Sequence, residues 1–335
     1  MKKNISTLLS IFWACILQAQ QSPIMVCNGN GTICTPYYSL NEAVHMANAN
    51  EFIYLPGGTF QLDSTIDKPL NIIGAGCRQD SSATTGITTI NGNLIISKNA
   101  SSSLFEGFFL NGVMNTPDTL RDCLFRRMNS GGFAITGYIE ACLIEHCILR
   151  ESSSMNGSGC WITNSIVRTI HGLQNSTIQH TIFFGDVGYT SWGGYWATFN
   201  GCNSTSFSHC IFMHAIGWPN GSNSNMCMAN NVYLGGSHGG FSFTCDYNNY
   251  TANSLADVFQ NPVQVTDIYN INESALQVIP SLPMGYNTVR GIYGGDSPWK
   301  PGMVPSNPHI FFKQVSSNTN QNGDLPVLIK VRTEN

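Results

Sequence analysis

Apolar residues recur along the chain in short runs separated by one or two polar residues, without the 3.6-residue period of an amphipathic helix. One pattern occurs six times: an apolar residue, any residue, Asp, His or Asn, a small polar residue or Cys, an aliphatic residue, and an apolar residue. The six copies span residues 120–125, 144–149, 162–167, 178–183, 207–212 and 228–233. They begin 24, 18, 16, 29 and 21 residues apart. The mean of about 21.6 residues indicates a repeat architecture.

Each copy predicts a strand, a sharp bend and a second strand. Asn, Asp and His tolerate a left-handed backbone better than most residues, so the polar third position turns the chain. Three short strands close one coil, and each coil pairs with the next about 4.8 Å along the axis. Helical repeats are longer, at about 33 residues or more, and the consensus of a leucine-rich repeat is missing. We expect an all-β, single-stranded right-handed parallel β-helix (a solenoid) with eight to ten coils over residues 60–260.

Both ends of such a solenoid need a cover. Ser39 and Glu42 have the spacing of a capping box, and the apolar residues that follow them fall on one face. We predict a short amphipathic capping helix over residues 39–50, within an N-terminal cap over 20–59. Residues 261–335 are expected to form a C-terminal cap and a strand-rich tail.

The first nineteen residues have the order of an export signal. Lys2 and Lys3 precede an apolar stretch, and Ala19 ends a cleavage-site pattern. The stretch is shorter than the roughly 20 apolar residues of a membrane span, and no later segment reaches that length. Lipidation of Cys15 would give an anchor, but the residues before it are a poor context. We predict a signal peptide over 1–19 and a protein that is secreted or held at the outer cell surface, with no membrane span.

Charged residues are scarce. Asp, Glu, Lys and Arg make up 10% of the chain, against about 25% in an ordinary domain. The formal charge is −4, and it becomes −6 when Lys2 and Lys3 leave with the signal. A negative chain without a basic face is not expected to bind nucleic acid. Disorder is excluded because apolar residues form 42% of the chain and recur in regular runs.

Twelve cysteines suggest a disulfide framework, but most lie inside strand-like runs. A free cysteine packs as a small hydrophobe, so these residues are predicted to fill the core. Cys123, Cys147 and Cys210 share one position of the repeat, and Cys147 and Cys210 should lie about three coils apart, too far for a disulfide. Cys27 and Cys34 flank a glycine-rich loop and are candidate disulfide partners in an oxidising compartment.

Three segments resemble known β-helix proteins. Ile53-Tyr-Leu-Pro-Gly-Gly-Thr-Phe60 and Leu70-Asn-Ile-Ile-Gly-Ala-Gly76 follow the predicted helix and resemble the opening coil of the pectin-lyase-like superfamily. Residues 291–310 resemble the ending of small secreted bacterial β-helix proteins. The resemblance covers roughly residues 37–335 and implies the fold. It implies no single activity, because this superfamily contains lyases, hydrolases, adhesins and proteins of no known role.

The enzymes of this superfamily use residues that this chain lacks or scatters. The lyases take a proton with Arg or Lys and commonly use calcium held by several acids, but no lysine occurs between Lys98 and Lys300 and the coil aspartates are dispersed. The arginines left for such a role are Arg121, Arg126, Arg127, Arg150 and Arg168. The hydrolases need two facing carboxylates as acid and base, and no such pair is visible. The sequence therefore predicts no catalytic residue.

Histidines fall at the bend position of three repeats, as His146, His180 and His209. We interpret them as structural. A zinc site built from stacked His and Cys is disfavoured, because other residues stand at the equivalent positions of the coils between them: Asn164, Ser165 and Thr181.

The longest repeat spacing coincides with glycine-rich loops that carry aromatic residues. Between residues 186 and 221 these are Trp192, Tyr195, Trp196 and Trp218. Such rings can stack on sugar faces, since each has a flat apolar surface and a polar edge. The alternative is that they fold back over exposed core. We predict these four as the ligand-binding residues.

The sequence thus favours a non-catalytic, glycan-binding or adhesin-like module outside the cell. Its predicted partner is an extracellular polysaccharide, with no cofactor and no metal site. The alternative is a polysaccharide lyase or glycoside hydrolase with an atypical active site, for which calcium is the expected cofactor. A purely structural role ranks third, and no pattern indicates an oligomeric state.

Overall fold

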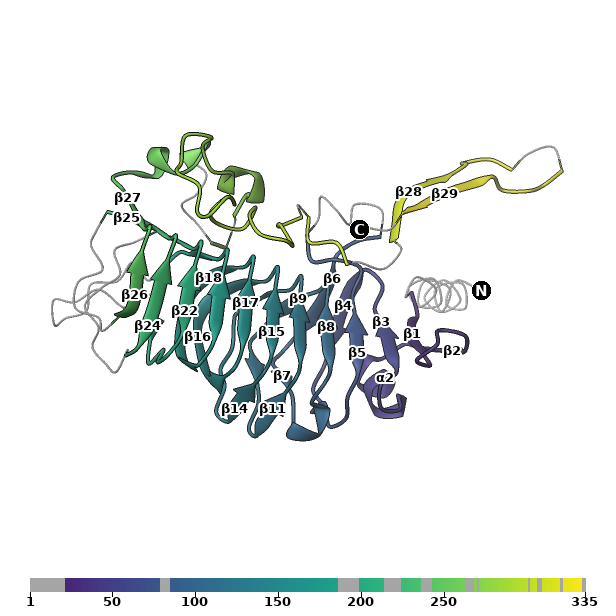
Figure 1. Cartoon of the computed structure of the whole chain (residues 1–335). Helices are drawn as coiled ribbons and strands as arrows, with labels where there is room; N and C mark the ends of the chain where they lie inside the picture. The colour runs from purple at the N-terminus through teal and green to yellow at the C-terminus, as the bar shows by residue number, and fades with distance from the viewer. Residues whose placement is uncertain are drawn as a thin grey trace, which may run out of the picture.

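The computed structural model is a β-solenoid of about nine turns, in which short strands stack rung upon rung along an elongated body (Figure 1). Strands form 44% of the chain and helix is sparse, so the predicted parallel β-helix is confirmed. The structure describes residues 22–78, 85–185, 199–213, 224–235, 243–262, 268–269, 271–300, 302–305, 309–319 and 322–332.

The first long sheet, sheet A, contains one parallel strand from each rung and is extended by two antiparallel strands at its N-terminal end. Its parallel strands are, in order, β3 (Phe52–Tyr54), β5 (Asn71–Ile73), β8 (Leu104–Glu106), β12 (Leu124–Arg126), β15 (Leu143–Glu145), β17 (Trp161–Thr163), β19 (Thr177–Gln179), β22 (Ser206–Ser208), β24 (Met226–Ala229) and β26 (Phe243–Tyr247).

The second long sheet, sheet B, is formed by the strands that follow those of sheet A along the chain, one from each rung. Its main path is β4 (Gly58–Gln61), β6 (Thr88–Asn91), β9 (Phe109–Asn111), β13 (Asn129–Ser130), β16 (Ile148–Ser158), β18 (Ile166–Gln174), β20 (Ile182–Phe183), β23 (Ile211–Phe212), β25 (Val232–Leu234) and β27 (Tyr250–Ala252). Shorter strands complete the coils: β7 (Leu94–Ile95), β10 (Met114–Asn115), β11 (Thr119–Arg121), β14 (Tyr138–Glu140) and β21 (Phe199–Asn200).

The core follows from the in-register pairing of sheet A. In each three-residue strand the middle side chain points inward and the outer two point away from the core, as the two-residue period of a strand requires. These middle residues pair directly from rung to rung and are fully buried: Ile53, Ile72, Phe105, Phe125, Ile144, Ile162, Ile178, Phe207 and Met228. Like side chains therefore stack on like, as in Phe105 on Phe125 with ring centroids 5.3 Å apart.

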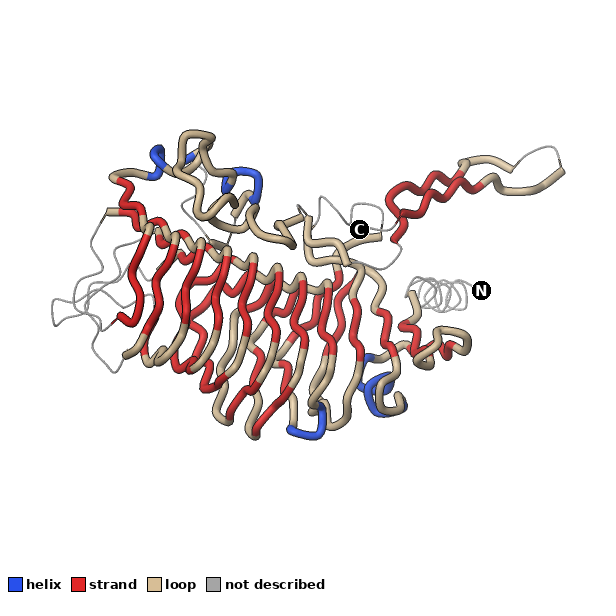
Figure 2. Tube along the Cα trace, in the orientation of Figure 1, coloured by secondary structure: helices blue, strands red, loops and turns tan. Residues whose placement is uncertain are grey.

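Sheet A is bounded on both sides by bends in the left-handed conformation, which line up along its edges (Figure 2). The first bend column precedes the strands and consists of Ser102, Asp122, Ala141, Gly159, Asn175, Ser204 and Asn225. The second bend column follows the strands and consists of Gly107, Arg127, His146, Asn164, His180, His209, Asn230 and Asn248. All of these residues have φ between 44° and 73°. The predicted bend position of the histidines is thus confirmed.

One of the six sequence repeats is misaligned. Five copies cross the second bend column, whereas residues 120–125 cross the first. In that copy the strand after the bend, and not the strand before it, belongs to sheet A. The prediction that Cys123 shares a position with Cys147 and Cys210 is therefore wrong. The repeat pattern admits Asp, His or Asn at its third position, and residues of this set occur in both bend columns, so the pattern does not distinguish the two bends.

Cysteines of the coils mostly fill the core, as expected. Three buried thiols follow the first bend on consecutive rungs: Cys123, Cys142 and Cys160. Cys147 and Cys210 follow the second bend with two rungs between them, and both are buried free thiols. The expectation that these two residues do not bond to each other agrees with the structure.

Two disulfides are present among the described residues. Cys27 is bonded to Cys34 across the first hairpin of the chain. Cys227 is bonded to Cys245, its direct partner on the next rung, with 4.5 Å between the Cα atoms. The second bond is not predicted from the sequence, because the strand-like runs place the coil cysteines in the core.

The N-terminal edge of sheet A is covered by a hairpin that is not predicted from the sequence. It consists of β1 (Ile24–Cys27) and β2 (Cys34–Tyr37), and β1 pairs antiparallel with β3. This pairing satisfies backbone groups that an open edge strand would expose.

A helix, α2 (Leu40–Met46), follows Ser39, whose side chain accepts a hydrogen bond from the Glu42 amide. The helix is shorter than the predicted 39–50 because Ala47 has an extended backbone. Its apolar face is buried and joins the core. Its role as the cap of the solenoid stays a prediction.

After the last rung the chain turns back and runs along the second bend column (Figures 1 and 2). The described residues of this return include the short 3-10 helices η2 (Leu255–Asp257) and η4 (Glu273–Leu276). A further 3-10 helix, η1 (Lys98–Ala100), lies between earlier strands. The chain ends in an antiparallel hairpin of β28 (His309–Val315) and β29 (Val327–Arg332).

The first bend column gives a direct test of backbone strain. Ala141 (φ 53°) and Gly159 (φ 64°) are both exposed and occupy the same position of adjacent rungs. A left-handed backbone costs alanine about 1–2 kcal/mol, and glycine loses part of that advantage through its unfolded-chain entropy. We expect Ala141→Gly to raise the free energy of unfolding by about 0.5–1 kcal/mol and Gly159→Ala to lower it by a similar amount, measured by chemical denaturation. Changes of the same sign in the two variants would contradict the assigned bends.

Candidate functional site

The aromatic residues predicted to bind ligand, Trp192, Tyr195, Trp196 and Trp218, lie outside the residues that the structure describes. The signal segment 1–19 also lies outside them. Within the described residues, a candidate site lies on the outer surface of sheet A.

The arginines considered for a lyase are engaged with neighbouring side chains. Four of them form ion pairs with glutamates of the adjacent rung: Arg121 with Glu140 (2.7 Å), Arg126 with Glu145 (2.8 Å), Arg127 with Glu106 (3.2 Å) and Arg168 with Glu151 (3.3 Å). The fifth, Arg150, lies over the ring of Phe109, with 4.6 Å from its guanidinium carbon to the ring centroid. The four paired arginines thus hold their charge against a carboxylate and link the rungs of the stack.

The outer face of sheet A has two parallel columns of side chains. One column is apolar and consists of Leu104, Leu124, Leu143 and Trp161. The other is charged and then polar, and consists of Glu106, Arg126, Glu145, Thr163 and Gln179. Trp161 stands where the apolar column ends, and half of its surface is exposed.

A cavity of about 600 Å³ opens over β15, β17 and β19. Its floor is the outer face of sheet A, where Trp161 and Glu145 belong to different columns. Its far wall is the returning chain over residues 287–297, which contributes Asp296 and Ser297. We call this space the Trp161 groove.

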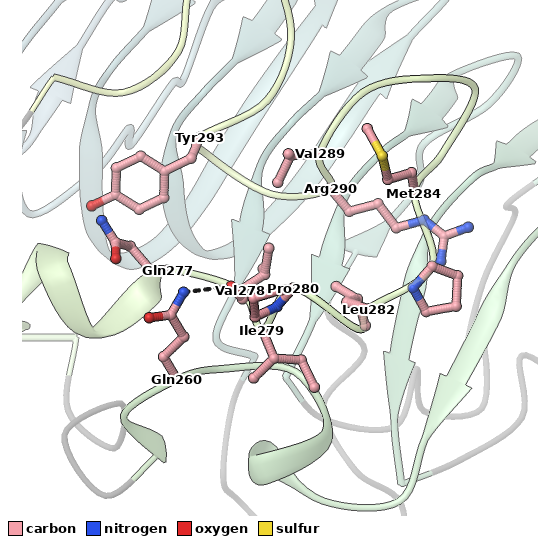
Figure 3. Close-up of a pocket in the computed structure, with 11 residues that line it drawn as sticks. Gln260, Gln277, Val278, Ile279, Pro280, Leu282, Met284, Val289, Arg290 and Tyr293 are labelled. Carbon is pink, nitrogen blue, oxygen red and sulfur yellow. Dashed lines mark hydrogen bonds between the residues drawn. The ribbon is translucent and has the colours of Figure 1, made fainter.

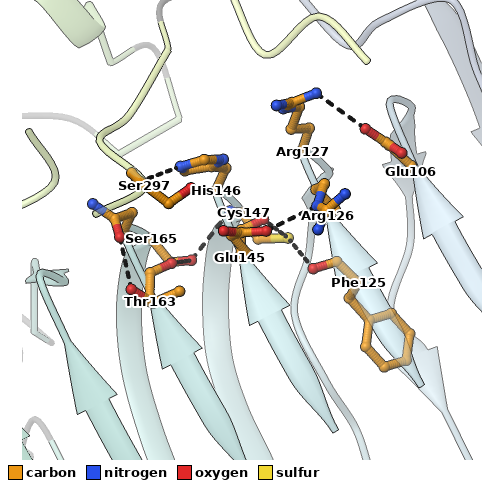
Figure 4. Close-up of polar contacts among 11 residues, drawn as sticks. Glu106, Phe125, Arg126, Arg127, Glu145, His146, Cys147, Thr163, Ser165 and Ser297 are labelled. Carbon is orange, nitrogen blue, oxygen red and sulfur yellow. Dashed lines mark hydrogen bonds and ion pairs between the residues drawn. The ribbon is translucent and has the colours of Figure 1, made fainter. Parts of the chain in front are cut away.

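Bend side chains hold the returning chain in place. His146 donates a hydrogen bond from Nε2 to the carbonyl oxygen of Ser297 at 2.8 Å (Figure 4). Asn164, one rung further on, donates from Nδ2 to the carbonyls of Ile292 and Gly294, both at 2.8 Å. A carbonyl oxygen only accepts, so the first bond requires the tautomer of His146 with the proton on Nε2.

A histidine pair on the next two rungs continues this contact. The rings of His180 and His209 stack with centroids 4.8 Å apart. His209 donates from Nε2 to the Gly285 carbonyl at 3.0 Å, and the Gly291 amide donates to the His209 carbonyl at 2.7 Å. Gly295 packs closely against His180, since a Cβ there would lie 2.8 Å from the ring. These bend histidines therefore anchor the wall of the Trp161 groove.

Glu145 lies in the floor of the groove, and its carboxylate is paired with Arg126 (Figure 4). Burial acts to raise its pKa, but a hydrogen bond from the Ser297 side chain and the interactions with His146 and Arg126 outweigh burial, so the pKa is lowered. Burial lowers the pKa of His146 and outweighs its hydrogen bond to Ser297. At neutral pH Glu145 is therefore a carboxylate, and the Arg126 guanidinium 2.8 Å away balances its charge.

This arrangement can bind a neutral polar molecule that has a flat apolar face. The Trp161 ring offers an exposed apolar surface, and Thr163, Gln179 and Glu145 offer hydrogen-bonding groups beside it. Within the described part of the chain, no group of three or more His, Cys, Asp or Glu residues is placed to hold a metal ion.

Trp161 is a site residue that was not predicted from the sequence, although its signal was present. It immediately precedes Ile162, the first and inward-pointing residue of the repeat copy at 162–167. The two-residue period of a strand then directs residue 161 outward. The residues of the far wall carried no such signal, since their contacts with the bends run through backbone carbonyls.

Comparison of the chain with known protein families, with curated proteins and with solved structures gives no match. None of the helices in the described ranges is long and apolar enough to cross a membrane.

The bend histidines predict acid sensitivity of the groove wall. Burial and the neighbouring His209 lower the pKa of His180 to about 4. Between pH 6.5 and 4 the imidazole of His180 binds a proton in the unfolded chain but not in the folded chain. The contribution of neutral His180 to the free energy of unfolding is therefore fully present above about pH 7 and falls as the pH drops through that window. We expect His180 alone to cost about 2 kcal/mol of unfolding free energy between about pH 7 and pH 5, measured by chemical denaturation.

The matched variant is His180→Asn, because Asn occupies the equivalent bend of other rungs as Asn164 and Asn230. This variant should lose about 2 kcal/mol less than the parent protein over the same pH interval. His45→Gln, at an exposed position, should leave the loss unchanged. An equal pH dependence in His180→Asn and the parent would contradict the assignment.

Proposed function

We propose that this chain is an exported, non-catalytic β-helix protein that binds a glycan in the Trp161 groove. The observation that carries the proposal is the half-exposed Trp161 ring on the floor of a 600 Å³ cavity that has hydroxyl, amide and carboxylate groups around it. A sugar ring presents an apolar face and an edge of hydroxyl groups, which matches this combination.

The support of Trp161 favours binding at low entropic cost. Its strand pairs with β15 and β19 on either side, and its neighbour Ile162 is fully buried. The ring therefore projects from a backbone fixed by sheet hydrogen bonds. A ligand that stacks on it has little protein conformational entropy to remove.

The alternative function, cleavage of a glycan, is favoured by one observation. Glu145 and Asp296 are two carboxylates that line the same cavity. A general acid in such a pair needs a raised pKa, however, and the pKa of Glu145 is lowered. Glu145 is also bonded to Arg126 at 2.8 Å. These features favour recognition over bond cleavage.

Several features of the chain support export. Two disulfides are consistent with an oxidising compartment. The low charge content and the basic start of residues 1–19 agree with a secreted solenoid. The resemblance of residues 53–76 to the pectin-lyase-like superfamily makes a glycan the first class of ligand to test.

Trp161→Ala is the direct test. Loss of a central stacking ring should weaken glycan binding by about 2 kcal/mol, or roughly 30-fold, while the melting temperature changes little because the side chain is half exposed. Binding is first detected on a glycan array and then measured by titration calorimetry. Tyr247→Ala is the matched control, since Tyr247 is an exposed aromatic on the same face of sheet A, four strands along from β17.

Other outcomes discriminate between the alternatives. Equal glycan affinities of Trp161→Ala and the parent protein would show that the glycan does not bind in the Trp161 groove. If Trp192→Ala or Trp218→Ala then abolished binding, the aromatic insertion predicted from the sequence would carry the contact. Release of reducing ends or unsaturated products from the bound glycan would identify the protein as an enzyme.

A further inference from the structure

A second cavity, of about 320 Å³, lies within the returning chain and shares no lining residue with the Trp161 groove (Figure 3). We call it the Arg290 cavity. Its lining consists of Gln260 and of residues in two segments, 277–284 and 289–293. Most of its lining side chains are apolar, among them Val278, Ile279, Leu282, Met284 and Val289. Its volume is at the lower end of the range of small-molecule sites, roughly 300–1,000 Å³.

One cation stands in this apolar lining. Arg290 is only 2% exposed. Its Nη2 donates to the Asn248 carbonyl at 2.8 Å, but its Nε and Nη1 are buried and have no acceptor among the residues that the structure describes. No Asp or Glu belongs to the described residues that line the cavity. The guanidinium is thus buried with one of its nitrogens satisfied.

A buried guanidinium without a counter-charge is costly, because desolvation of the charge is not offset by an ion pair. Burial lowers the pKa of Arg290, because the cost of desolvation applies to the charged form and not to the neutral one. Guanidinium N–H groups that lack acceptors are satisfied best by an anion, above all by a carboxylate. The cation therefore selects the charge of a ligand.

The other lining residues indicate the chemistry of the uncharged part of the ligand. Gln260 already uses its Nε2 in a 2.9 Å hydrogen bond to the Val278 carbonyl (Figure 3). The Tyr293 hydroxyl donates to the Glu273 carbonyl at 2.8 Å. The remaining surface consists largely of aliphatic side chains and two prolines. Transfer of an alkyl chain from water to such a surface is favourable, whereas a sugar would leave hydroxyl groups without hydrogen-bond partners.

We propose that the Arg290 cavity binds a small aliphatic carboxylate, with the carboxylate at Arg290 and the alkyl chain against the apolar wall. Met284, which is 57% exposed, stands at the solvent side of this cavity and lies beside the arginine side chain (Figure 3). The inference is independent of the proposed glycan site, because the two cavities have no residue in common.

Titration calorimetry of the full chain with octanoate, octanol and octylamine at neutral pH tests the charge requirement. The affinity for octanoate should be at least about tenfold higher than that for octanol, and octylamine should not bind. Arg290→Gln should weaken octanoate binding by about the same factor while octanol binding is unchanged. Arg121→Gln is the matched control, since Arg121 is an exposed arginine on the coils and should leave octanoate binding as it is.

A second variant keeps the test decisive if Arg290→Gln does not fold. Met284→Trp changes an exposed side chain and leaves the guanidinium in place, and it should block octanoate without lowering the melting temperature. Octanol binding as tightly as octanoate, no octanoate binding up to millimolar concentration, or unchanged octanoate binding in Met284→Trp would each overturn the proposal. None of these results bears on glycan binding by the Trp161 groove.

Discussion

The whole body depends on one constraint: each rung must present the same backbone position to the next, because the sheet hydrogen bonds run between rungs. The Leu143 amide donates to the Cys123 carbonyl of the preceding rung, and the Trp161 amide donates to that of Cys142. The strands of sheet A are mostly three residues long, so each contributes few such bonds. A shift of one residue would turn its buried middle side chain to the surface. The two bend columns keep this register, since from β8 onward left-handed residues precede or follow the strands at matching places on successive rungs.

The candidate site is a consequence of the same register. Side chains outside the core also stack in columns, and this brings an apolar column and a charged column side by side on sheet A. The second bend column has a further role. His146, Asn164 and His209 are polar residues that tolerate a left-handed backbone, and their side chains bind the carbonyls of the returning chain. That chain then forms the far wall of the Trp161 groove.

The sequence predicts the features that recur in each repeat, but not the contacts between side chains of neighbouring rungs. The mean coil length, the inward apolar residues and the bend histidines belong to a pattern that occurs six times, so the sequence alone predicts them. The ion pair of Arg126 with Glu145 joins residues 19 positions apart, and it becomes visible only when the register between two rungs is known. The misaligned copy at 120–125 shows why that register was not determined, since Asp122 in the first bend mimics the polar residue of the second. The Arg290 cavity lies beyond the repeats, where no period exists to reveal it.

A pair of engineered cysteines in sheet A tests the register and the place of Trp161 most directly. Leu143 and Trp161 are direct partners on adjacent rungs, as are the bonded Cys227 and Cys245. The double variant Leu143→Cys, Trp161→Cys should form an intramolecular disulfide under mild oxidation, identified by peptide mass spectrometry. The pair Leu124→Cys, Trp161→Cys lies two rungs apart, beyond the roughly 7 Å reach of a disulfide, and should stay reduced. A bond in the second pair, or none in the first while the protein remains folded, would contradict the register on which the groove is built.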